Sequence, residues 1–290
     1  MCIVTKIYIL PVDKKLQTTQ QQFNYPPHNS NFGVEDDFLI YLSKNNNLIV
    51  QSPELADWHY LPIYWTRWHL NHDNGQTGLD ELQQAAQKAI IDDSKTFTIC
   101  QYDDGPKVDL GATIVFLASR KTETGIDIPL LCKPHRKPLF PQRKKYLATF
   151  AGSMATHPIR QEMRDALQDR EDIFLLDGKM STRRYIKNTL SSWIILCPRG
   201  YGGSSFRFFE AMQLGRVPFL IGEPDTRPFK RFISWESCSL YCKQPSQIND
   251  IIDKLTESEL NEMGKQAAQI YQEYLRYQVW CKSIIRELES

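Results

Sequence analysis

From residue 146 onward, the chain alternates short apolar runs of strand length with amphipathic segments of helical length. The apolar runs cover residues 146–151, 173–176, 193–197 and 217–221. The segments between them carry apolar residues three or four positions apart, at 157–167, 183–190 and 205–214. Strands alternating with helices predict βαβ units, which form a parallel sheet covered by helices on both faces. We therefore expect a doubly wound α/β domain in this half.

The ends of these helices carry local signals of their own. Pro158 suits the first turn of the helix at 157–167, and we expect Thr156 to cap it. Gly215 follows the helix at 205–214 and is expected to close it.

The first half shows the same alternation less clearly. Short apolar runs predict strands, and one amphipathic segment at 78–92 predicts a helix. The runs cover residues 3–10, 48–51, 60–64, 96–102 and 112–118. A polar stretch at 17–31 is expected to be a mobile loop.

A segment at 133–145 is the candidate linker between two domains. It contains three prolines and six Lys or Arg in thirteen residues, which suits neither a helix interior nor a strand. We interpret it as a solvated hinge, with a surface for an acidic glycan or a membrane as the alternative. The predicted domains are 1–140 and 141–265, followed by a C-terminal helix at 266–290.

The apolar residues of the tail, from Leu260 to Leu288, are spaced three or four apart. This spacing predicts long C-terminal helices that pack back on the chain's own core. A helix that binds a partner is the alternative.

Composition excludes several classes of protein. The 290 residues are about twice the commonest domain size, and 41% hydrophobic residues supply a sizeable core. Since 35 Lys and Arg balance 34 Asp and Glu, the chain has no global field for a polyanion, and we expect no nucleic-acid partner. Seven cysteines without a zinc-like C-x-x-C pair indicate reduced thiols. With no apolar run long enough to span a membrane, we expect a soluble, cytoplasmic protein.

The segment richest in chemistry runs from Trp193 to Pro228, in the order strand, glycine-rich turn, helix, strand. Such a turn lies at the carboxyl edge of a parallel sheet, where these folds bind ligands. Three glycines, Gly200, Gly202 and Gly203, allow a ligand to approach the backbone closely.

The start of the following helix is a predicted anion site. Ser204 or Ser205 can cap that helix, whose free N–H groups attract anions. Arg207 lies in its first turn and Arg199 precedes the glycine turn, and two cations beside a positive helix end are favourable when an anion joins them. We expect a phosphate or diphosphate there.

Glu210 lies three residues after Arg207, on the same helix face, and its carboxylate can accept hydrogen bonds from a ribose diol. A salt bridge within the helix between these two residues is the simpler alternative. The pair Gly200 and Gly202, with Glu223 about twenty residues on, also resembles a dinucleotide-binding fingerprint. Ser205 replaces the third glycine of that fingerprint, which makes an oxidoreductase the second hypothesis.

The stretch LCPRGYGGSSFRFFEAMQLGRVPFLI resembles the signature of the exostosin-like glycosyltransferases of family 47. That signature has a strand, C-x-P-x-G, a variable turn, S-x-R-x-x-E-A and then G-x-V-P-V. Three earlier segments resemble family motifs in the same order, namely PELADWHYLPIYW, YDDG and YLATFAGSMATHPIR. The resemblance spans about residues 53–229.

This resemblance implies an α/β protein of the GT-B class, with two Rossmann-like domains whose parallel sheets face a cleft. It also implies an inverting glycosyltransferase that needs no metal or other cofactor. The donor is then a UDP- or GDP-sugar, and the acceptor an oligosaccharide or glycoconjugate. The absence of any Asp-x-Asp in the sequence is compatible with this chemistry.

By motif match, the resemblance also implies roles for particular residues. Arg199, Ser205, Arg207 and Glu210 would contact the nucleotide diphosphate and ribose. Gly152 and Arg160 would line the same cleft from the neighbouring strand and helix.

An inverting transfer needs a base that removes the proton of the acceptor hydroxyl. Asp103 and Asp104 follow the predicted strand at 96–102, and a carboxyl edge is where such a base belongs. Asp103 stands where the family usually has histidine. An ordinary Asp-Asp-Gly turn is the alternative, and Asp57 and His59 are the next candidates for the base.

Two further questions stay open at this stage. The aromatic residues between Trp58 and Trp68 suit core packing better than a sugar-stacking surface. A subunit that keeps the nucleotide pocket without catalysing transfer is the third hypothesis.

Overall fold

The computed structural model describes residues 5–19, 33–139 and 141–290. The chain divides into two compact units. Unit 1 contains Met1–Leu131 and Tyr277–Ser290, and unit 2 contains Cys132–Arg276. The predicted boundaries at 140 and 265 therefore differ from the observed division at 131/132 and 276/277.

The first boundary moves because the linker belongs to unit 2. His135 donates its backbone N–H to Gln213 Oε1 over 3.2 Å, and the Lys144 ammonium donates to the carbonyls of Leu190 and Ser192. Burial of Lys144 lowers its pKa to about 7. These contacts tie His135 and Lys144 to unit 2, while most of the other described residues of 133–145 are exposed to solvent.

The second boundary moves because the tail returns to unit 1. The Asp37 carboxylate accepts hydrogen bonds from the backbone N–H of Gln278 at 2.7 Å and from Trp280 Nε1 at 2.8 Å. The expected single helix at 266–290 is two helices, α8 (Glu257–Ile270) and α9 (Cys281–Leu288). Gln278 adopts a positive φ of 66° between them, which a helix interior does not allow.

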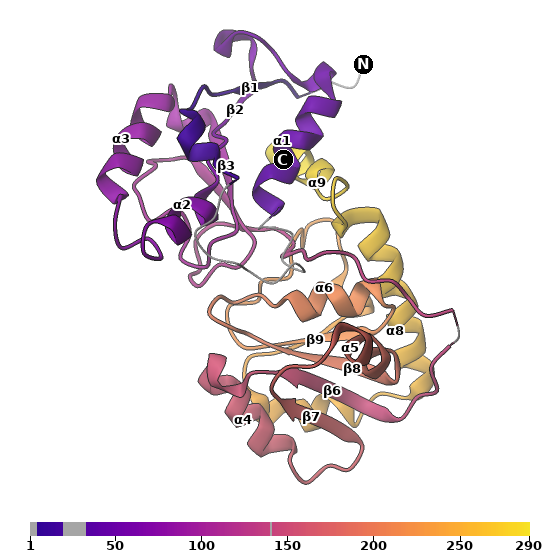
Figure 1. The fold of residues 1–290 in the computed structure, drawn as a ribbon. Helices are drawn as coiled ribbons and strands as arrows, with labels where there is room; N and C mark the ends of the chain where they lie inside the picture. The colour runs from indigo at the N-terminus through magenta and orange to yellow at the C-terminus, as the bar shows by residue number, and fades with distance from the viewer. Residues whose placement is uncertain (1–4, 20–32, 140) are drawn as a thin grey trace. The chain divides into compact units, whose positions relative to one another are not determined.

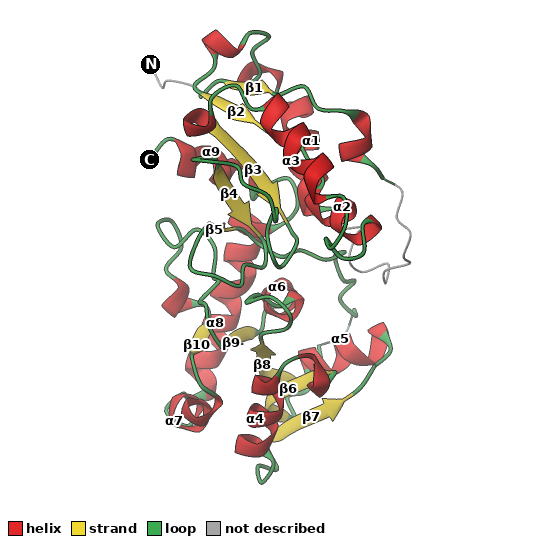
Figure 2. Cartoon of the chain, turned by 90° about the vertical axis from the view of Figure 1, so that its left-hand side faces the viewer, coloured by secondary structure: helices red, strands yellow, loops and turns green. Residues whose placement is uncertain are grey.

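Unit 1 is a parallel five-stranded sheet whose strands follow chain order (Figures 1 and 2). The strands are β1 (Ile7–Ile9), β2 (Trp58–Tyr60), β3 (Thr96–Cys100), β4 (Ile114–Leu117) and β5 (Ile126–Asp127). Its helices are α1 (Val34–Lys44), α2 (Trp65–Asn71), α3 (Leu79–Ala89) and α9.

Several predictions for this half are confirmed, and others are wrong. The strands predicted at 96–102 and 112–118 are β3 and β4, and the helix predicted at 78–92 is α3. The strand predicted at 60–64 ends at Tyr60, since Pro62 removes a ladder donor. Residues 48–51 form one bridge, Ile7 to Ile49, instead of a strand. From residue 20 on, the predicted loop at 17–31 lies outside the described residues, as do residues 3 and 4 of the first predicted strand.

Glu35, in the first turn of α1, is a buried carboxylate that joins three elements of unit 1. Its Oε1 accepts hydrogen bonds from the Thr66 backbone N–H at 3.0 Å, the Thr66 hydroxyl at 2.8 Å and the Gln101 backbone N–H at 2.9 Å. Burial raises the pKa of Glu35 to about 7, although these hydrogen bonds oppose the shift.

We expect Glu35 to make the stability of unit 1 depend on pH. Because its pKa rises from 4.5 to about 7 on folding, the folded state holds the proton between these values. The stabilisation is fully present below pH 4.5 and is lost as the pH rises through 7, a fall of up to about 3 kcal/mol. Glu35→Gln should remove this part of the pH slope in urea unfolding. The exposed Asp80→Asn serves as the control, and equal slopes in wild type and Glu35→Gln would contradict the assignment.

Unit 2 is also a parallel five-stranded sheet, in the order β10-β9-β8-β6-β7. Its strands are β6 (Tyr146–Gly152), β7 (Ile173–Asp177), β8 (Ser192–Pro198), β9 (Val217–Ile221) and β10 (Leu240–Cys242). Its helices are α4 (Pro158–Leu167), α5 (Thr182–Leu190), α6 (Phe206–Gln213), α7 (Ile248–Ile252) and α8. The doubly wound sheet and its four predicted strands are confirmed, whereas β10 was not predicted.

Helices cover both faces of this sheet (Figure 1). On one face, α4, α7 and α8 pack against alternate strand residues such as Phe150, Leu196 and Phe219. On the other, α5 packs on α6, and Asn188 of α5 donates to the Thr149 hydroxyl of β6 over 2.6 Å. Alternation along each strand therefore fixes which helix lies on which face.

Two parallel α/β units, with the last helix packed back on the first unit, confirm the expected GT-B class. Gly215 ends α6 with a φ of 71°, as expected of a helix-closing glycine. The predicted cap Thr156 is wrong, because His157 occupies the cap position of α4 and its Nδ1 accepts from the Ile159 N–H over 3.2 Å. Within the described part of the chain, no helix combines the length and the apolar character needed to cross a bilayer.

Candidate functional site

The strand order of unit 2 defines one place for a ligand. The chain passes from β6 outward to β7 on one side, and then to β8 on the other side of β6. The connections therefore diverge between β6 and β8, and doubly wound folds bind ligands outside the carboxyl ends of the strands at such a point. Residues following Gly152 and Pro198 lie at this switch point.

The turn after β8 leads into the N-terminus of α6. Ser205 occupies the N-cap position, but its side chain makes no capping hydrogen bond. The residue is only 5% exposed, and its Oγ has no hydrogen-bond partner among the described residues. Ser204 beside it is also buried. A buried, unpartnered hydroxyl at a helix N-terminus is available to a ligand oxygen.

The Arg207 guanidinium lies against the end of β6. Its Nε donates to the Ala151 carbonyl over 2.9 Å, and its Cζ lies 5.0 Å from the centre of the Phe150 ring. A Cβ built on Gly152 would overlap the Arg207 terminal nitrogens and lie 2.9 Å from Cζ. Glycine at 152 is therefore what allows Arg207 to occupy this place.

Arg160 of α4 reaches the same point from the opposite side. It donates to the Arg199 carbonyl over 3.0 Å and to the Ser153 carbonyl over 2.8 Å. Its Cζ lies 5.6 Å from the centre of the Phe150 ring that also faces Arg207. A Cβ on Gly200 would lie 3.2 Å from an Arg160 terminal nitrogen. Arg160, Arg207 and both glycines are thus brought together.

Arg199 lies at the same edge of the sheet but turns toward β9. Its backbone N–H donates to the Ile221 carbonyl over 3.0 Å, and its Nη1 donates to the Glu223 carbonyl. The Glu223 side chain pairs with Lys243 over 2.8 Å. Arg199 therefore contributes positive charge here, while its guanidinium is held at the strand β9 side of the turn.

Two observations give the electrostatic character of this point. Burial, and then the charge of Arg207, lower the pKa of Arg160 to about 10. Burial also lowers the pKa of His157, and the charges of Arg199 and Arg160 lower it further. Within the described residues, neither Arg160 nor Arg207 forms an ion pair with a carboxylate. The local field is positive, which favours an anionic ligand.

Glu210 is buried on α6 and has partners other than Arg207. Its Oε1 lies 2.6 Å from His135 Nε2, and its Oε2 accepts from the Tyr185 hydroxyl at 2.9 Å. Burial alone would raise the pKa of Glu210, but the His135 hydrogen bond and the charges of His135 and Arg207 lower it overall. The salt bridge within the helix, considered as an alternative for Glu210 and Arg207, does not form.

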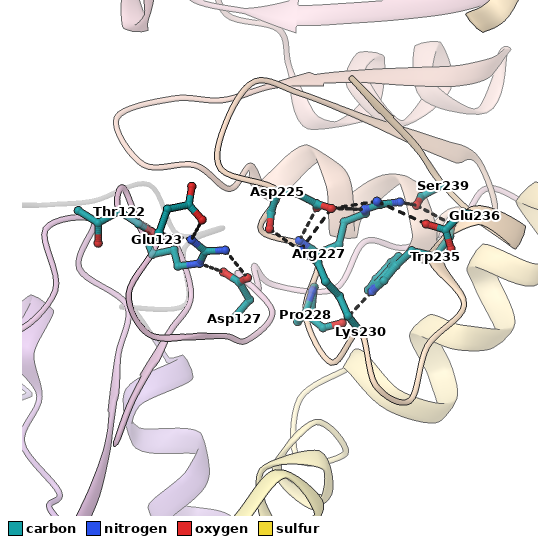
Figure 3. A network of polar contacts seen from close by, with 11 residues as sticks. Thr122, Glu123, Asp127, Asp225, Arg227, Pro228, Lys230, Trp235, Glu236 and Ser239 are labelled. Carbon is teal, nitrogen blue, oxygen red and sulfur yellow. Dashed lines mark hydrogen bonds and ion pairs between the residues drawn. The ribbon is translucent and has the colours of Figure 1, made fainter. Parts of the chain in front are cut away.

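The loop after β9 is fixed by a second network (Figure 3). Arg227 binds both carboxylate oxygens of Asp225, through Nε at 3.0 Å and Nη2 at 2.9 Å, and donates to the Ser239 hydroxyl over 3.3 Å. Trp235 Nε1 donates to the Pro228 carbonyl over 2.8 Å. These contacts are internal to the loop and hold the carboxyl edge of β9 and β10 in shape.

In unit 1, Asp103 and Asp104 lie in a turn directly after β3, as expected. The Gly105 N–H donates to the Tyr102 carbonyl over 3.0 Å, which closes the turn, and the Lys121 ammonium pairs with the Asp104 carboxylate. Both aspartates line a pocket of about 380 Å³ that also includes Arg120, Thr122 and Thr124. The Asp-Asp-Gly segment therefore forms an ordinary turn, and it also presents its carboxylates to a pocket.

Arg120, which lines this pocket, is held by carboxylates of its own. It donates to Asp127 through Nε at 2.8 Å and Nη2 at 3.0 Å, and Glu123 lies 3.6 Å from its Nη1. The charge of Arg120 at the wall of the pocket is therefore balanced by carboxylates.

The second-choice bases are engaged in structural contacts. Asp57 accepts from the Lys6 backbone N–H over 2.7 Å, and His59 is buried with Nε2 3.3 Å from the Pro53 carbonyl. The aromatic residues Tyr60, Tyr64, Trp65 and Trp68 are all buried. The core-packing interpretation of the aromatic cluster is therefore confirmed for these four.

Sequence reasoning missed the residues that surround Glu210. Its carboxylate is met by His135 from the linker, by Cys132 directly before the linker and by Tyr185 from α5. The C-x-x-H spacing of residues 132–135 was the available signal. It did not stand out, because the partner carboxylate lies 75 residues further along the chain.

Comparison with known proteins finds a family model that matches this chain. The model of the Exostosin GT47 domain matches residues 108–255, just over half of the chain. Exostosin-1 of Drosophila melanogaster is 27% identical over 160 residues, which is 47% of this chain and 21% of that protein. An Exostosin-1 homolog of Caenorhabditis elegans is 20% identical over 321 residues, covering 93% of this chain and 81% of that protein. The chain thus spans about a fifth of the length of the Drosophila relative.

Among solved structures, the crystal structure of Anabaena HepE in complex with UDP is similar at 10% identity and a TM-score of 0.45. The match covers 98% of this chain and 99% of that chain.

Proposed function

This chain belongs to the Exostosin GT47 family of glycosyltransferase domains, and we propose that it transfers a sugar from a nucleotide-diphosphate donor to a hydroxyl of an oligosaccharide or glycoconjugate. We further propose that the transfer inverts the anomeric configuration and needs no metal ion for its chemistry. The family membership replaces the oxidoreductase hypothesis.

The observation that carries the proposal is the meeting of Arg160 and Arg207 at the N-terminus of α6, without a carboxylate partner among the described residues. Two guanidinium groups at one aromatic ring repel each other, and an anion that binds between them offsets this repulsion. The helix end adds donors and a positive dipole. A diphosphate carries the charge and the acceptor oxygens that this arrangement suits.

Each residue then has a proposed role toward the donor. Ser205 and the N–H groups of the first turn of α6 donate to phosphate oxygens. Arg207 and Arg160 neutralise the charge that develops on the leaving diphosphate, and Arg199 adds to the positive field. Gly152 and Gly200 leave the room that the arginines occupy. Glu210 accepts from the ribose diol, for which it must exchange one of its present hydrogen bonds.

For the acceptor hydroxyl, Asp104 is the proposed base, with Asp103 as the neighbour that shapes its turn. The carboxylate removes the proton as the oxygen attacks the anomeric carbon from the face opposite the diphosphate. The bond from the anomeric carbon to the diphosphate breaks in the same step. The pocket beside Asp104 is of a size that suits one sugar ring.

A cytoplasmic location is also proposed. The described cysteines are all free thiols and all buried, which is expected in a reducing compartment.

Nucleotide binding tests the proposal directly. We expect UDP or GDP to raise the midpoint of thermal unfolding, because a ligand that binds the folded state at 100 times its Kd stabilises it by about 2.7 kcal/mol. NAD should produce no shift. A shift with NAD alone, or with none of the three nucleotides, would contradict the proposal.

A further inference from the structure

Three potential metal ligands of different chemistry meet inside unit 2. Cys132 Sγ, one ring nitrogen of His135 and one carboxylate oxygen of Glu210 all lie within 4.8 Å of one another. Cys132 and His135 stand in a C-x-x-H spacing at the start of the linker, and Glu210 comes from α6. Cys132 is 5% exposed and Glu210 is 7% exposed.

The surroundings hold these groups in place. His135 Nε2 lies 2.6 Å from Glu210 Oε1, while the Tyr185 hydroxyl donates to Oε2 over 2.9 Å. The backbone of His135 is fixed by the hydrogen bond to Gln213. A hydrogen bond to the second oxygen of a coordinating carboxylate is the usual way in which proteins orient such a ligand.

We propose that Cys132, His135 and Glu210 form a binding site for a divalent cation of the zinc class. Thiolate, imidazole and carboxylate are the three ligand types that Zn²⁺ prefers, and a water molecule completes a tetrahedron. In a tetrahedral site, the ligand atoms lie about 3.3 to 3.8 Å apart, so shifts of about an ångström in these side chains suffice.

Charge balance favours the same cation. Coordination displaces the thiol proton to solvent, and a thiolate, a neutral imidazole and a carboxylate then sum to the charge that Zn²⁺ neutralises. Mg²⁺ and Ca²⁺ are disfavoured, because both prefer all-oxygen sites.

One consequence rests on the proposed function. If Glu210 binds the ribose of the donor, a metal ion on its carboxylate competes with the nucleotide. Zn²⁺ is then an inhibitor, although the proposed chemistry needs no metal.

Metal binding to the chelator-treated full chain, without nucleotide, tests the site itself. Co²⁺ serves as the spectroscopic probe for Zn²⁺, and we expect one equivalent to bind with a near-ultraviolet thiolate-to-cobalt absorption band. Cys132→Ser should abolish that band, and both Cys132→Ser and His135→Gln should weaken Zn²⁺ binding at least about 100-fold in calorimetry. Cys238→Ser, which removes another buried thiol of the same unit, should bind like wild type.

Circular dichroism of Cys132→Ser and His135→Gln establishes whether each variant folds. Because the two substitutions remove different ligands, the test still holds if one of the variants does not fold. The metal site would be overturned if folded wild type bound no stoichiometric metal ion, or if neither variant weakened the binding of the metal. The three side chains would then form a hydrogen-bonded cluster only. If Zn²⁺ binds and the affinity for UDP is unchanged, the metal site is supported and Glu210 does not contact the donor. The two proposals therefore fail separately.

Discussion

Replacing Arg207 with glutamine is expected to lower kcat/KM for the nucleotide sugar by about 10² to 10³-fold. The guanidinium lies at the end of β6 and the start of α6, where a leaving diphosphate gains charge during transfer. Removing one preorganised group that stabilises developing charge costs about 3 to 4 kcal/mol in other enzymes. Steady-state kinetics with UDP- and GDP-sugars, and the thermal shift by the matching diphosphate, measure the effect.

Arg183→Gln is the matched control, because Arg183 is exposed on α5 and lies outside the proposed donor site. It should change neither the kinetics nor the thermal shift. Gly152→Ala offers a second route to the same result, since its Cβ would displace the Arg207 guanidinium while leaving residue 207 unchanged. If Arg207→Gln keeps full kcat/KM and the full thermal shift, the assignment of this arginine is wrong.

Asp104→Asn is expected to lower kcat by about 10² to 10⁴-fold and to leave nucleotide binding unchanged. The asparagine amide cannot take up the proton of the acceptor hydroxyl, but it has the size of the carboxylate and keeps the geometry of the turn. The change also removes the ion pair with Lys121, so Lys121→Met is needed to separate the two effects. That variant should retain most of the activity.

Asp103→Asn identifies which of the two neighbours removes the proton. A larger loss of kcat at Asp103 than at Asp104 would exchange their proposed roles. Normal turnover by both single variants would exclude this turn as the source of the base. Loss of turnover with UDP binding retained is also the result that separates an enzyme from a subunit that only binds nucleotide.

The fold of unit 2 was predictable because its sequence signals agree with one another. The run at 217–221 is apolar with a β-branched residue at each end, begins two residues after a helix-closing glycine and is buried along its whole length as β9. Nothing in the tertiary structure opposes the local preference there. The same agreement among local sequence signals predicted β6, β8 and α6, and with them the glycine-rich turn.

Unit 1 was less predictable, since its elements depend on distant partners. The N-terminus of α1 carries Glu35 and Asp37, which are unusual in a core. Both are buried because residues far along the chain donate to them, Gln101 to Glu35 and Trp280 to Asp37. No local pattern reveals such pairings.

The site shows the same division. Glycines and arginines around the turn were visible as a motif, and the structure brings Gly152, Arg160, Gly200 and Arg207 together. The partners of Glu210 were not visible, because His135 and Tyr185 reach it from the linker and from another helix. Motif spacing therefore located the turn, and only the fold could supply its surroundings.

A crystal structure of the chain with a bound nucleoside diphosphate tests the central claim most directly. The account predicts the diphosphate at the N-terminus of α6, with an oxygen about 3 Å from Ser205 Oγ and the Arg207 guanidinium within hydrogen-bond distance of another. A diphosphate bound elsewhere, with Ser205 Oγ and Arg207 unchanged and without contact to it, would contradict the account.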